Sequence, residues 1–157
     1  MNPSLKGKLS PLSIKLFEAK KEKKLTFAEI GEKLGKDEVW VAAVFYEQAK
    51  PEESDLVKLG VLLDIQENYL INSFDVHTYF PNRGGLFDLP PADPLIYRLY
   101  EIIQVYGYPL KAIINEKFGD GIMSAIDFTA NVEKVEKDDQ ERVKITLEGK
   151  YLPFKKW

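Results

Sequence analysis

The sequence predicts an α+β protein with a helical first half and a smaller helix-and-strand second half. Apolar residues recur at helical spacing up to about residue 73. Prolines and glycines interrupt that pattern between residues 75 and 92, and beyond residue 125 apolar residues alternate with polar ones. A period near 3.6 residues is typical of amphipathic helices, whereas a period of two is typical of half-buried strands.

Start and stop signals divide the first half into helices. Ser10–Pro11 opens the first helix, because serine is a favoured N-cap and proline is tolerated in the first turn. Thr26 and Glu29 form a T-x-x-E capping box that opens a second helix, and Gly35 ends it. Asp37 is the expected N-cap of a third helix.

Two more helices complete the predicted helical domain. Pro51 lies near the start of a fourth helix, and a shorter fifth helix is expected from Gln66 to Ser73. We therefore expect three parts along the chain: a helical domain over residues 1–80, a connector over 81–92 and a C-terminal domain over 93–157.

The C-terminal domain is expected to begin with two helices. Asp93–Pro94 reads as the N-cap and first-turn proline of a sixth helix, which should stop at Gly107. Pro109 then precedes a seventh helix from Lys111 to Phe118, closed by Gly119.

Beyond residue 119 the pattern predicts a β-hairpin. Two alternating runs each place their apolar residues on one face, and polar residues from Glu136 to Glu141 are expected to form the loop between them. The first run has Ile126, Phe128 and Ala130; the second has Val143, Ile145 and Leu147. Two strands alone are marginally stable in water, so we expect them to find partners in a second copy of the chain.

Composition excludes several classes of function. The 157 residues carry a net charge of −3, which gives no general attraction to nucleic acid or to an anionic membrane. There is no cysteine and a single histidine, His77, so thiolate chemistry and multi-histidine metal cages are excluded. No apolar run approaches the roughly 20 residues of a membrane span, and the N-terminus lacks the apolar core of a signal peptide. We expect a cytoplasmic protein.

The segment from Thr26 to Tyr46 has the layout of a helix-turn-helix, as in lambda-repressor-like bundles. A recognition helix needs basic or amide side chains, but the first turn here offers Asp37, Glu38 and Trp40. Residues 1–80 hold eleven lysines against thirteen acids and no arginine. A packing or oligomer-contact role is therefore favoured for this segment. A DNA-binding regulator with a C-terminal dimerisation domain is the alternative interpretation of the chain.

Arg98 and Glu101 are the notable charged pair of the C-terminal domain. They are three residues apart on a predicted helix and share a face of it. Their neighbours are mostly apolar or aromatic. Burying an arginine and a glutamate there is costly unless the two charges pair with each other or bind a ligand. An exposed ion pair worth about 0.2–0.5 kcal/mol is the plain interpretation, and a functional site is the other.

Three runs in the C-terminal domain resemble cyanate hydratases (cyanases). They are YRLYEIIQVYG at 97–107, LKAIINEKFGDGIMSAIDF at 110–128 and LEGKYLP at 147–153. The resemblance implies a lyase for cyanate degradation, with Arg98, Glu101 and Ser124 as its catalytic residues. It also implies a homodecamer, a pentamer of dimers with interlaced C-terminal strands and active sites between subunits. Cyanate and bicarbonate would be the substrates, carbamate and ammonia would be formed, and no metal or organic cofactor would be needed.

The chemistry of small anions agrees with those residue types. Arg98 supplies permanent positive charge in a planar fork suited to carboxylate-like oxygens. Ser124 can donate a hydrogen bond to an anion or accept one from a protonated oxygen. Glu101 would repel anions, so its expected role is to aim the Arg98 guanidinium. Backbone groups near Ile122 and Ala125 are expected to line the pocket because they flank the serine.

Two interpretations of this segment stay open. Asp120–Gly121 is either a turn that positions Ser124 or a plain helix-to-strand turn. A catalytically inactive relative with the same fold would keep the same pattern, although the intact Arg98, Glu101 and Ser124 argue against it.

Overall fold

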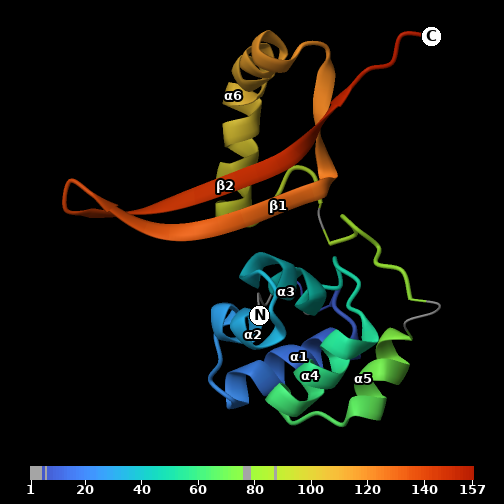
Figure 1. The fold of residues 1–157 in the computed structure, drawn as a ribbon. Helices are drawn as coiled ribbons and strands as arrows, with labels where there is room; N and C mark the ends of the chain where they lie inside the picture. Colours follow the sequence, from blue (N-terminus) through green and yellow to red (C-terminus); the bar gives the residue numbers. More distant parts are fainter. Residues whose placement is uncertain (1–4, 6, 76–78, 87) are drawn as a thin grey trace. The chain divides into compact units, whose positions relative to one another are not determined.

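The computed structural model describes residues 5, 7–75, 79–86 and 88–157. The chain divides into two compact units, Met1–Leu86 and Phe87–Trp157. The first unit is helical, and the second consists of one helix and a two-stranded antiparallel sheet (Figure 1). The predicted α+β class is confirmed.

The described residues of the first unit form five helices. They are α1 Pro11–Glu22, α2 Phe27–Leu34, α3 Glu38–Phe45, α4 Glu53–Leu63 and α5 Glu67–Phe74. Each helix predicted in this part of the chain is present, with boundaries within about two residues of those expected.

The predicted caps are confirmed by their hydrogen bonds. The Ser10 hydroxyl accepts from the Ser13 amide at 3.2 Å. Thr26 accepts from the Glu29 amide at 3.1 Å while the Glu29 carboxylate accepts from the Thr26 amide at 2.7 Å. These reciprocal bonds satisfy amides that would otherwise have no partner at a helix start.

The first unit has a continuous apolar core. Phe45, Phe74 and Leu16 are its largest fully buried side chains. Phe17 and Phe27 pack edge-to-face against Phe45, with ring centroids 5.4 and 5.2 Å away. All fifteen buried residues of this cluster lie between Leu12 and Phe74, so the first unit has a core of its own.

One continuous helix, α6 Pro94–Phe118, occupies the region where two helices were predicted. The expected N-cap is correct, since the Asp93 carboxylate accepts from the amides of Leu95 and Ile96. The expected break at Gly107–Pro109 is wrong. Glycine costs about 1 kcal/mol and proline about 3 kcal/mol inside a helix, but the turns on either side keep their own hydrogen bonds and the helix continues through them.

The second unit ends in a long hairpin of β1 Gly121–Lys137 and β2 Gln140–Pro153. The connecting turn is Asp138–Asp139, both left-handed with φ of 55° and 56°, as a two-residue type I′ turn requires. The predicted loop from Glu136 to Glu141 is therefore too long. The tight turn keeps those polar residues in the ladder, where Glu136 lies opposite Glu141 and Lys137 opposite Gln140. An exposed cross-strand ion pair also forms there, with Lys134 2.5 Å from the Glu141 carboxylate.

The hairpin has one apolar and one polar face. Phe128, Ala130 and Val132 of β1 lie opposite Gly149, Leu147 and Ile145 of β2, as the alternation predicted. The next residues along each strand form the polar face, which includes the 2.7 Å ion pair between Glu133 and Lys144. Ile126 does not belong to the apolar face, because it lies in an irregular part of β1 and is 97% exposed.

No apolar side chain of α6, β1 or β2 is buried. Half-exposed and exposed apolar residues cover these elements, with Val143 at 74% and Ile145 at 43%. Residues 88–157, unlike the first unit, therefore form no closed core in a single chain.

Candidate functional site

Arg98 and Glu101 form an ion pair near the start of α6. Nη1 of Arg98 lies 2.5 Å from Oε2 of Glu101, one helical turn further on. The guanidinium carbon also lies 5.5 Å from the centroid of the Tyr97 ring. A carboxylate and an aromatic ring thus restrict the arginine, which remains 66% exposed in one chain. The guanidinium N–H groups that do not contact Glu101 can donate to a second anion.

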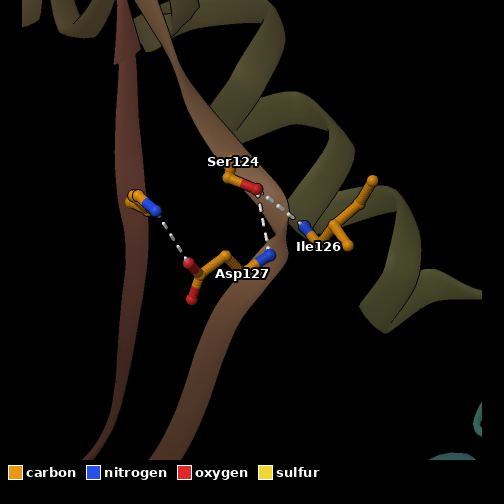
Figure 2. Close-up of polar contacts among 4 residues, drawn as sticks. Ser124, Ile126 and Asp127 are labelled. Carbon is orange, nitrogen blue, oxygen red and sulfur yellow. Dashed lines mark hydrogen bonds and ion pairs between the residues drawn. The ribbon is translucent and has the colours of Figure 1, made fainter.

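Ser124 lies at the other part of the predicted site, within β1. It is the one buried residue of that strand, at 6% exposure. Its Oγ accepts hydrogen bonds from the amides of Ile126 at 3.1 Å and Asp127 at 3.0 Å (Figure 2). A hydroxyl oxygen has two lone pairs and one proton, so these bonds use its acceptor capacity. With both acceptor positions engaged, the O–H proton of Ser124 remains for donation, and its role toward a substrate stays a prediction.

The serine is held by a bulge in the hairpin. The register passes from Met123 opposite Tyr151 to Phe128 opposite Gly149, so four residues of β1 face one residue of β2. Amides in a bulge lose their ladder partners, and the Ser124 hydroxyl replaces those partners for Ile126 and Asp127. The Asp127 carboxylate is also paired across the hairpin with Nζ of Lys150, at 3.8 Å.

A single chain brings only part of the predicted site together. Arg98 and Glu101 are in contact, whereas no hydrogen bond joins either of them to Ser124 within the described part of the chain. Ile122 is 49% exposed, and Ala125 is exposed within the bulge. Whether Ile122 and Ala125 line a pocket stays a prediction. Gly121 opens β1 opposite Pro153, so the predicted turn residue belongs to the strand.

Neither a metal cluster nor a membrane span is found among the residues that the structure describes. No group of three or more His, Asp or Glu side chains within the described ranges could hold a metal ion. No described helix is both long and apolar enough to cross a bilayer. His77 lies outside the described residues. The expected absence of a cofactor and the cytoplasmic location stay predictions.

Three features around Ser124 were not predicted. They are the two amides that bind its hydroxyl, the bulge, and the close approach of Gly149 in β2 to that bulge. Glycine inside an alternating strand pattern often marks a bulge or a close backbone approach. Gly149 in the run LEGKYLP carries that signal, so the bulge could have been inferred from the sequence.

Comparisons with known proteins agree with this fold. The family model of the cyanate lyase C-terminal domain matches residues 88–156. The cyanate hydratase of Mycosarcoma maydis is 51% identical over 156 residues, covering 99% of this chain and 95% of its relative. That of Prochlorococcus marinus is 56% identical over 146 residues, covering 90% and 94%. A crystal structure of cyanase from T. urticae superposes with a TM-score of 0.79 at 37% identity, covering 90% of this chain and 96% of that one.

Fold and site together define a small α+β protein whose second unit carries an arginine–glutamate ion pair and a hydrogen-bonded serine. The chain belongs to the cyanate hydratase (cyanate lyase) family. The alternative of a DNA-binding regulator finds no support in these relatives. It is also opposed by the acidic start of α3, where Asp37 caps the helix and Glu38 follows.

Proposed function

We propose that this chain is a cyanate hydratase, a lyase that decomposes cyanate in a bicarbonate-dependent reaction. The observation that carries the proposal is the 51% identity to a cyanate hydratase over 99% of the chain. The preformed Arg98–Glu101 pair and the donor geometry of Ser124 support it at the level of the site.

The proposed reaction begins with bond formation between the two anions. An oxygen of bicarbonate attacks the cyanate carbon, the C–N π electrons move to nitrogen, and a mixed dicarboxylate forms. The bond between the bridging oxygen and the former bicarbonate carbon then breaks, which releases carbon dioxide and, with protonation of the nitrogen, leaves carbamate. Carbamate loses the second carbon dioxide and becomes ammonia. Overall, one cyanate, one bicarbonate and two protons give two carbon dioxide molecules and one ammonia.

Arg98, Ser124 and Glu101 are assigned separate roles in that sequence. Arg98 holds the substrate anions together against their mutual repulsion, which a fixed cation can do at any relevant pH. Ser124 donates its O–H to an oxygen that gains charge as the new bond forms. Glu101 is a positioning residue that fixes the guanidinium before substrates arrive. Proximity and charge stabilisation suffice for this chemistry, so we propose that it proceeds without a cofactor.

We propose that the active site is completed by assembly of the chain into a homo-oligomer, a pentamer of dimers with interlaced C-terminal strands. The half-exposed apolar faces of α6 and the hairpin need a cover that one chain does not provide. Symmetry repeats the same residues around a shared interface, so copies of Arg98, Glu101 and Ser124 from neighbouring chains can supply one site.

Ammonia release in carbon-dioxide-depleted buffer, with and without added bicarbonate, tests the reaction. Release should require both anions and should be accompanied by net proton uptake, which a pH-stat measures. Arg98→Ala should abolish release, while Arg142→Ala is a matched control because Arg142 pairs near the hairpin tip with Asp138, away from the proposed site residues. Absence of ammonia from assembled wild-type protein would refute the proposed function.

The role of Glu101 needs its own comparison. Glu101→Gln keeps the shape of the side chain and removes the charge that holds Arg98, so we expect KM for the anions to rise and kcat to fall. Near-normal kinetics in this variant would contradict the positioning role.

A further inference from the structure

The position of the Ser124 hydroxyl depends on the backbone of the bulge around it. Oγ is fixed by two amides that belong to the bulge itself, those of Ile126 and Asp127. A shift of the bulge would therefore move both amides and the serine together. The ion pair from Asp127 to Lys150 is too exposed to hold the bulge, because its side chains are 71% and 65% exposed.

Gly149 lies directly against the bulge from the opposite strand. A Cβ at position 149 would overlap the carbonyl oxygen of Ser124 and would lie 2.7 Å from Cγ of Met123. The first of these neighbours is backbone, which cannot rotate away as the end of a side chain can. The missing side chain at 149 therefore allows the strands to approach at the point where β1 carries four residues against one.

Gly107 of α6 provides a contrast within the same unit. A Cβ there would meet only Cγ2 of Ile103, at 3.6 Å, which is an ordinary van der Waals separation. An added methyl group is thus tolerated at position 107, whereas at position 149 it would displace the backbone of β1.

We propose that Gly149 is a positioning residue for Ser124: its missing side chain lets the bulge close against β2, and the closed bulge directs the serine hydroxyl as a donor toward the substrate anion. This inference rests on the proposed function for its effect on rate. Its structural part, the closure of the bulge, can be tested without turnover.

A double-mutant cycle in the assembled full-length protein separates positioning from general damage. kcat and KM for ammonia release are measured for wild type, Ser124→Ala, Gly149→Ala and the double variant, with Gly107→Ala as the control and size-exclusion chromatography to check assembly. Because a misplacement of about 1 Å can cost about 100-fold in rate, Gly149→Ala should lower kcat by about 100-fold. On the Ser124→Ala background the same change should cost little or nothing, because the hydroxyl it positions is gone.

Hydrogen exchange at the Ile126 and Asp127 amides provides a readout independent of activity. Exchange should be slow in wild type and Gly107→Ala, and faster in both Gly149→Ala and Ser124→Ala.

Three results would overturn the inference. They are equal losses of rate from Gly149→Ala on both backgrounds, unchanged rate and exchange in Gly149→Ala, and failure of Gly149→Ala to assemble where Gly107→Ala assembles. An inactive wild type would instead refute the proposed function, and the exchange data would still decide whether Gly149 closes the bulge.

Discussion

The apolar face of the hairpin offers a direct test of the proposed assembly. Ile145 lies on that face, opposite Val132, and is 43% exposed in a single chain. Its neighbour Thr146 points to the polar face, opposite Asn131. Replacing each of them by aspartate therefore adds the same charge at adjacent positions on opposite faces of one strand.

The size of the effect follows from the exposed fraction. Full burial of an isoleucine side chain is worth about 1.5–3 kcal/mol, and the 43% of Ile145 that remains exposed corresponds to roughly 1 kcal/mol. A twofold interface contains the residue twice, which gives about 2 kcal/mol per dimer. That is about a 30-fold change in the dissociation constant. Burying an unpaired aspartate would add to this loss.

Sedimentation equilibrium over a range of protein concentrations measures the loss. Ile145→Asp should dissociate at concentrations where wild type and Thr146→Asp stay assembled, and ammonia release should fall with the assembled fraction. If Ile145→Asp assembled as tightly as Thr146→Asp, this face would not be an interface and the argument from exposed apolar area would fail.

Three further predictions concern the first unit and can be measured by urea denaturation followed by far-UV circular dichroism. Ser13→Ala should lower the free energy of unfolding by about 1–3 kcal/mol, because the fully buried hydroxyl donates to the carbonyl of Phe45, which would be left without this partner. Thr26→Ala should cost about 1 kcal/mol by removing the capping box. Burial raises the pKa of Tyr46 and of Tyr79, so the stabilisation from their neutral hydroxyls is fully present below the ordinary tyrosine pKa near 10 and is lost as pH rises through the folded-state pKa values. The alkaline loss should shrink when both tyrosines are replaced by phenylalanine.

Structural features that depend on a few neighbouring residues were predicted correctly from the sequence. The caps at Ser10, Thr26 and Asp37 depend on hydrogen bonds spanning two or three residues, and all three are present. The break expected at Gly107–Pro109 was wrong because local penalties were weighed without the cooperativity of the 25-residue helix around them.

Within the candidate site, the contact between Arg98 and Glu101 was predictable from the sequence, whereas the surroundings of Ser124 were not. The spacing of Arg98 and Glu101 is helical, so their contact followed directly from the sequence. The environment of Ser124 depends on Gly149, which approaches it only after the strands pair. Alternation therefore placed Ile126 on the apolar face, whereas the bulge shifts the register there and removes Ile126 from the ladder.

Assembly and catalysis should be coupled in this chain, because the second unit carries both the exposed apolar faces and the residues proposed for catalysis. An arginine that is 66% exposed is screened by water and holds a small anion weakly. Covering the apolar faces of α6 and the hairpin would exclude water from the neighbourhood of Arg98 and Ser124, which strengthens each of their interactions with an anion. A first unit with its own core does not need that cover, so it should stay folded when the oligomer dissociates. Dilution should therefore abolish ammonia release before it unfolds α1–α5, and simultaneous loss of both would contradict this separation of the two units.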